Sequence, residues 1–125
     1  MNTVEFEAVL GVNPGYNHDN DVVDVVDVVA LAVAAWDAAA EEELAAGGMY
    51  VPAAVTPGKA VYRQAWGCPQ GGEVVVVVSG ACNARFDDPA AWRDSVVAVA
   101  RRVKVSLGQS TVRIVFRVVE DEYLE

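Results

Sequence analysis

The chain has few of the residues that most metal and catalytic sites require. Its 125 residues contain two cysteines and one histidine, with no CxxC or HxxxH spacing. A structural zinc site or a disulfide framework is therefore not indicated. No glycine-rich loop stands between a predicted strand and a predicted helix, which argues against a phosphate-binding loop. We expect no metal and no cofactor.

Basic residues are scarce as well. Nine Lys and Arg stand against 18 Asp and Glu, for a formal net charge of -9. Direct binding of nucleic acid needs a basic face to neutralise phosphates, so we expect none. An acidic surface instead suits a protein partner with a basic surface.

Long hydrophobic runs are also missing. The longest uncharged run in the most apolar stretch is Val28 to Trp36, nine residues, against the roughly 20 that a bilayer requires. Glu5 and Glu7 interrupt the start of the chain, where a secretory signal would be apolar. We expect no contact with a membrane and a cytoplasmic location.

Large aliphatic side chains are rare. The chain has 27 Val and 20 Ala but five Leu and one Ile, which predicts closely packed layers of small side chains. A chain of this length buries about two thirds of its unfolded surface. We expect one domain over residues 1–125.

The hydrophobic period changes four times along the chain, from strand to helix and back twice. Alternation predicts strands, and steps of three or four predict helices. A Pro57-Gly58 turn would join two strands into a hairpin, and Asp88 with Pro89 would begin the second helix. The predicted strands are 4–10, 49–56, 59–66, 73–79 and 110–119, and the predicted helices are 21–44 and 88–107.

This βαββαβ order resembles the ferredoxin-like α+β sandwich. The resemblance is one of topology and involves no shared sequence motif. It implies an antiparallel or mixed sheet of four to five strands with two helices on one face. The five consecutive valines of strand 73–79 indicate that this strand is central, with both faces covered.

Polar side chains concentrate in two loops, 13–20 and 80–88. We expect strands 4–10 and 73–79 to be parallel neighbours, which would bring these loops to one end of the sheet. Such positions next to helix amino termini are common ligand sites. The catalytic candidates are His18, Cys82 and Asp19, and the ligand-binding candidates are Tyr16, Asn17, Asn83, Arg85 and Asp87.

Two further features concern residues outside these loops. Cys68 and Cys82 flank strand 73–79 and would lie about 25 Å apart at roughly 3.3 Å per residue, so we predict two free thiols. Tyr62 and Trp66, next to the 67–72 loop, are a second candidate site. Aromatic residues in a strand more often belong to a core or an interface.

The first helix is apolar over more of its surface than one sheet would cover. This excess predicts a homo-oligomer, most simply a dimer, or else a helix covered by a long loop of its own monomer. The predicted contact consists of Val25, Val28, Leu31, Ala32 and Ala35.

Two functions compete on these observations. The favoured one is a small acidic, non-catalytic module that self-associates and presents an acidic face to a protein partner. The alternative is a small enzyme or small-molecule-binding protein with its site at loops 13–20 and 80–88. The favoured hypothesis depends on the lack of any recognisable catalytic constellation.

Overall fold

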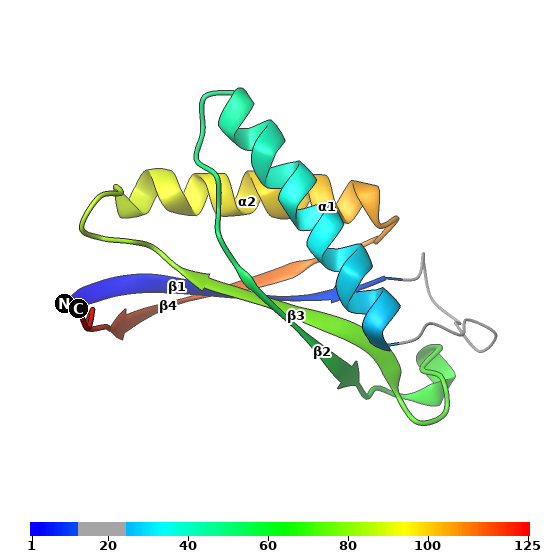
Figure 1. Cartoon of the computed structure of the whole chain (residues 1–125). Helices are drawn as coiled ribbons and strands as arrows, with labels where there is room; N and C mark the ends of the chain where they lie inside the picture. The colour runs from blue at the N-terminus through cyan, green and yellow to red at the C-terminus, as the bar shows by residue number, and fades with distance from the viewer. Residues whose placement is uncertain (13–24) are drawn as a thin grey trace.

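The computed structural model describes residues 1–12 and 25–125 of the chain. Four antiparallel strands form one sheet in the order β2-β3-β1-β4, and both helices cover the same face of it (Figure 1). The ferredoxin-like prediction is confirmed, with four strands. The elements are β1 (Asn2–Gly11), α1 (Val25–Ala45), β2 (Ala54–Ala60), a 3-10 turn (Gln64–Trp66), β3 (Glu73–Ala81), α2 (Pro89–Ser106) and β4 (Arg113–Glu120).

The core lies between the helices and the sheet and is organised around three aromatic rings. Phe6 of β1 stacks on Trp36 of α1, with ring centroids 5.5 Å apart, and meets Trp92 of α2 at 5.9 Å. The Trp36 indole Nε1 donates to the carbonyl oxygen of Val51 at 2.9 Å. Small valines and alanines fill the space around these rings, so the few large residues hold the two layers together.

The second helix begins as its sequence predicts. The Asp88 side chain accepts a hydrogen bond from the backbone N–H of Ala91 at 3.1 Å, and Pro89 takes the first helical position. The Arg102 guanidinium of this helix donates to the carboxylate of Glu43 on α1 at 3.3 Å. The two helices are therefore joined by a charged contact beside their apolar one.

The predicted hairpin around Pro57-Gly58 is wrong. Both residues lie inside β2, which pairs with β3 in the register Pro57 to Val76 and Gly58 to Val75. Because β2 is an edge strand, the missing N–H of proline need not leave a ladder bond unmade. Residues 49–53 form no strand, and β2 turns back to β3 through the segment 61–72.

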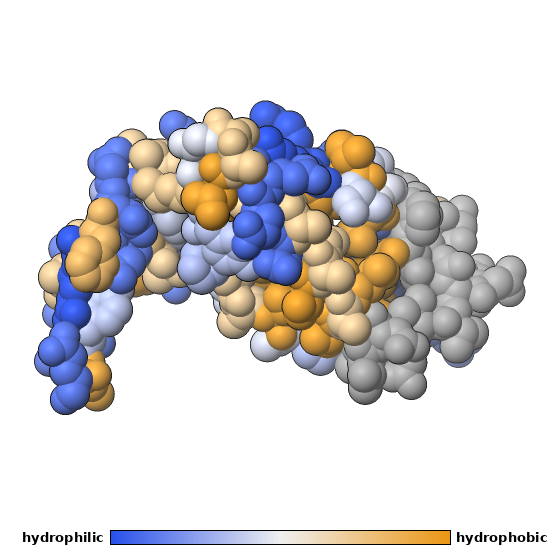
Figure 2. Space-filling model, turned by 45° about the horizontal axis from the view of Figure 1, so that its top comes forward, coloured by the Kyte–Doolittle hydropathy of each residue, from blue (hydrophilic) through white to orange (hydrophobic). Residues whose placement is uncertain are grey.

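The predicted self-association surface on α1 divides into buried and exposed residues. Val28 and Ala32 are fully buried in the core of the monomer and cannot contact a second copy, whereas Leu31 is 46% exposed. Ala35 is half-buried, and the side chain of Val25 lies outside the described residues. Figure 2 shows hydrophobic residues on the surface of the helical layer, so a homo-oligomer stays a prediction with Leu31 as its exposed member.

Membrane insertion finds no support in the helices. Among the described residues, neither helix is long and apolar enough to cross a bilayer.

Candidate functional site

The two strands that precede the loops of the predicted site end at opposite ends of the sheet. β1 pairs with β3 antiparallel, with Gly11 opposite Val75 and Glu5 opposite Ala81. The expectation of parallel strands is therefore wrong. In this topology β3 returns between β1 and β2, so the strand that is parallel to β1 is β2. Figure 1 shows the chain leaving β1 at one end of the sheet and leaving β3 at the other.

The residues of loop 80–88 have structural partners. The Asn83 side chain accepts a hydrogen bond from the backbone N–H of Arg85 at 3.2 Å. The Arg85 guanidinium pairs with Glu125 at 3.0 Å and lies 4.1 Å from the ring centroid of Tyr123. These contacts attach the end of the chain to the loop. The other predicted members, Tyr16, Asn17, His18 and Asp19, lie outside the described residues.

Cys82 is buried and poorly suited to act as a nucleophile. Burial raises the pKa of its thiol, and the nearby negative charge of Asp87 raises that pKa further. The Thr3 hydroxyl donates to the Cys82 carbonyl oxygen at 2.7 Å, which attaches this residue to β1. Cys68 is also buried, and both cysteines are free, as predicted.

We expect neither thiol of the folded protein to react with Ellman's reagent on the timescale in which both react in denaturant. Rapid labelling of the folded protein would contradict the assigned burial.

Raising the pH should also destabilise the fold. Above the ordinary cysteine pKa of about 8.5, the unfolded chain loses the Cys82 proton first, so the free energy of unfolding falls as pH rises. Urea titrations at pH 7.5 and 9.5 measure this fall. Cys82→Ala is the control, and it should reduce the difference between the two pH values.

A different group of side chains converges on the face of the sheet that the helices leave uncovered. Strand alternation places Val9 and Gly11 of β1 and Glu73 and Val75 of β3 on this open face. Val75 lies opposite Gly11, and Glu73 lies opposite Ala60 of β2. Tyr62 reaches the same place from the segment after β2, and the 109–111 connection closes one side. We call the resulting cavity of about 220 Å³ the open-face hollow, and its chemically active lining is Tyr62, Glu73, Gln109, Ser110 and Thr111.

Two glycines shape the hollow. A Cβ at Gly11 would lie 3.2 Å from the side-chain carbon Cδ of Gln109, so the missing side chain lets Gln109 lie over β1. Gly72, directly before Glu73, has a φ of +89°, and a Cβ there would be 3.1 Å from the Ala60 carbonyl oxygen. Glycine at these positions lets the neighbouring chain approach closely.

The lining combines one carboxylate, one phenol, an amide and two hydroxyls above a floor of valines. Such a site suits a ligand with a positive charge and an apolar or aromatic body. The described residues hold no group of three or more His, Cys, Asp or Glu that could bind a metal ion. Tyr62 belongs to the second candidate site that the sequence predicts, whereas the sequence analysis did not single out Glu73. The only sequence signal for Glu73 is that an acidic residue begins a strand of valines.

The fold has a counterpart among solved structures. A phage SAM lyase in complex with S-methyl-5'-thioadenosine superimposes with a TM-score of 0.60, over 98% of this chain and 93% of that chain, at 16% identity. At that identity the likeness shows the shared fold alone. No curated protein sequence matches the chain.

The sequence itself matches a family along its whole length. The family model described as SAM lyase covers residues 1–125. A lyase is an enzyme, so the prediction of a non-catalytic interaction module is wrong, and so is the preference, left open by the sequence, for a protein without catalytic activity. The alternative of a small enzyme is the better supported one. The chain belongs to the SAM lyase family.

Proposed function

We propose that this protein cleaves S-adenosylmethionine (SAM) and releases S-methyl-5'-thioadenosine, with the open-face hollow as part of its active site. The match of the SAM lyase model to residues 1–125 carries the proposal. The ligand of the phage SAM lyase supports the identity of the product. S-methyl-5'-thioadenosine is SAM without its four-carbon amino acid, so the bond to be broken joins the sulfonium sulfur to the γ-carbon.

A lyase breaks this bond without water, and SAM carries a nucleophile of its own, so we propose ring closure within the substrate. The α-carboxylate oxygen of SAM can attack its own γ-carbon and close a five-membered ring. The carbon–sulfur bond breaks, its electron pair returns to sulfur, and the products are S-methyl-5'-thioadenosine and homoserine lactone. The carboxylate is already ionised and the thioether leaves as a neutral group. No proton has to be moved, so the reaction needs no general acid or base.

The enzyme's task is then to fold the substrate and exclude water. SAM in solution rarely adopts the conformer in which its carboxylate oxygen lies in line with the γ-carbon. An enzyme that binds this conformer holds the reacting atoms in position. Opposite charges on carboxylate and sulfonium cancel as the ring closes, which a poorly hydrated site favours. The valine floor of the hollow supplies such a surface, formed by Val9 and Val75.

Charge supports the same assignment. SAM carries a sulfonium, an ammonium and a carboxylate, for a net charge of +1 at neutral pH. A protein with a formal net charge of -9 attracts such a cation. Within the hollow, we assign the Glu73 carboxylate to the substrate's ammonium group and the Tyr62 ring to the neighbouring sulfonium. The hollow of about 220 Å³ is smaller than the roughly 300–1,000 Å³ usual for ligand pockets, so we propose that further residues complete it.

Oxygen labelling tests this reaction. We expect SAM incubated with the enzyme in H₂¹⁸O to yield homoserine lactone with no label. Later opening of the lactone by water places ¹⁸O in the carboxylate, because water attacks the carbonyl carbon. Mass spectrometry with fragmentation measures which oxygen carries the label. Label in the hydroxyl oxygen would show direct hydrolysis and contradict a lyase, and absence of S-methyl-5'-thioadenosine would contradict the proposed function.

A further inference from the structure

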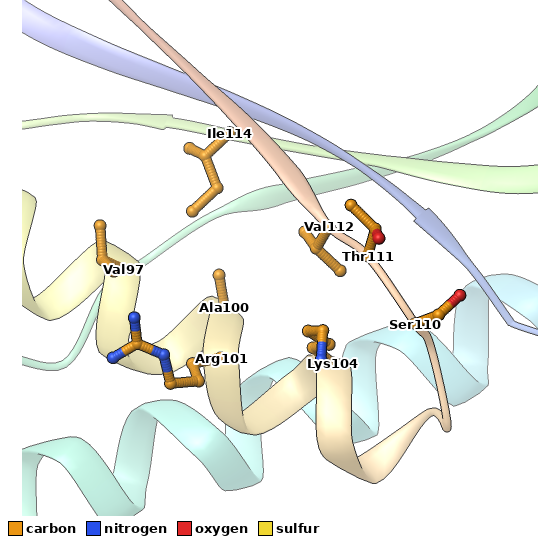
Figure 3. Close-up of a pocket in the computed structure, with 8 residues that line it drawn as sticks. All are labelled: Val97, Ala100, Arg101, Lys104, Ser110, Thr111, Val112 and Ile114. Carbon is orange, nitrogen blue, oxygen red and sulfur yellow. The ribbon is translucent and has the colours of Figure 1, made fainter.

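A second cavity, of about 390 Å³, lies between α2 and β4. Figure 3 shows Val97 and Ala100 projecting from α2 toward Ile114 on β4 and Val112 just before that strand. These four side chains form an apolar wall. Arg101 and Lys104 of α2 line the same cavity, together with the hydroxyl residues Ser110 and Thr111 of the connection to β4. We call this the α2–β4 cavity.

The charge of its lining is unusual for this chain. Arg101 and Lys104 are two of nine basic residues in a protein with 18 acidic ones, yet none of the described residues that line the cavity is acidic. Within the part of the chain that the structure describes, neither cation forms an ion pair. Most of the other arginines differ, since Arg85, Arg102 and Arg117 pair with glutamates and Arg63 and Arg93 lie over aromatic rings. Among the described residues Arg113 resembles Arg101 in having neither kind of contact, but it lines no part of this cavity.

The helix dipole accounts for only part of this arrangement. A cation in the last turn of a helix is stabilised by the free carbonyl groups there, and Lys104 occupies that turn of α2. Arg101 lies before the last turn and beside Val97, where the same effect is weak. Two uncompensated cations beside an apolar wall and two hydroxyls form a set that is complementary to an anion with an apolar body.

We propose that the α2–β4 cavity is a binding site for an amphipathic organic anion, with its carboxylate on Arg101 and Lys104 and its apolar body against Val112 and Ile114. The inference does not rest on the proposed function, because it concerns a different cavity. Ser110 and Thr111 line both this cavity and the open-face hollow. A bound anion therefore contacts the same segment that closes one side of the hollow.

Octanoate is the probe, measured by isothermal titration calorimetry with the full chain. We expect octanoate to bind, and both acetate and octanol to bind at least about tenfold more weakly, because each lacks half of the recognised chemistry. The double variant Arg101→Gln/Lys104→Gln should lose at least about tenfold in octanoate affinity. The matched control Lys59→Gln/Arg113→Gln removes the same charge from two cations outside the cavity and should bind as the parent does. Circular dichroism should show both variants folded.

Three results would overturn the proposal. They are no octanoate binding by the parent, equal binding by the Arg101→Gln/Lys104→Gln variant, and competition between octanoate and S-methyl-5'-thioadenosine. Competition would mean that the cavity is a portion of the substrate site. Failure of the proposed function is a separate result, because it shows as no binding or release of S-methyl-5'-thioadenosine while octanoate still binds.

Discussion

Replacing Glu73 with glutamine is expected to lower kcat/KM for SAM by about 10–100-fold. The change removes one negative charge and keeps the size of the side chain. A hydrogen bond to a charged group contributes about 1.5–3 kcal/mol, which corresponds to this range. We assign the charge to the substrate's ammonium group, which SAM has and S-methyl-5'-thioadenosine lacks. The inhibition constant of S-methyl-5'-thioadenosine should therefore change less than about threefold.

The contrast between the two ligands makes this variant informative. Steady-state kinetics with SAM, with S-methyl-5'-thioadenosine as an inhibitor, measure both constants in one series. Glu120→Gln is the matched control, because it removes the same charge at the exposed end of β4 and should leave both constants unchanged. Equal losses for the two ligands would mean that Glu73 supports the fold or the nucleoside part of the site. An unchanged kcat/KM would place the active site elsewhere.

Replacing Trp36 with alanine is expected to lower the free energy of unfolding by about 3–5 kcal/mol, the usual range for a buried large aromatic residue. Trp36 is 3% exposed and stacks on Phe6. Its loss also leaves the Val51 carbonyl oxygen without the indole N–H that bonds it. The surrounding side chains are mostly Val and Ala, which are too short to fill the space left behind.

Trp66 provides the control for this measurement. Its side chain is 66% exposed and its contact with the Arg63 guanidinium spans 5.8 Å, so Trp66→Ala should cost less than about 1 kcal/mol. Urea unfolding followed by far-UV circular dichroism measures both variants. A similar small loss for Trp36→Ala would contradict the assigned role of the aromatic cluster in joining helices and sheet.

The lack of a catalytic motif misled the functional prediction for a chemical reason. Most recognisable constellations exist to move protons or to activate a nucleophile. The ring closure of SAM that we propose needs neither, because the nucleophile is part of the substrate and the leaving group is neutral. An enzyme for such a reaction requires a shaped, poorly hydrated surface and one or two charges. Residues such as Glu73 and Tyr62 carry no local spacing that would mark them.

The Pro57-Gly58 prediction failed because turn chemistry is only a local preference. The same dipeptide is acceptable in an edge strand, where an N–H can be missing without cost to the ladder. Whether a strand lies at an edge depends on which strands it pairs with. The partner of β2 is β3, and the pairing places the reversal at 61–72 instead.

By itself the sequence determined the two helices and their place among the strands, the start of α2 at Asp88 and the central place of β3. These features follow from periodicity, capping and burial, which act over a few neighbouring residues. The same sequence predicted five strands where the structure has four, and it predicted that both faces of β3 are covered although the helices cover one (Figure 1). The tertiary structure alone decided the antiparallel pairing of β1 with β3, and with it which loops share an end of the sheet. It also brought Glu73, Tyr62 and the 109–111 segment together. Contacts between residues so far apart in the chain depend on register and strand direction, which no local pattern encodes.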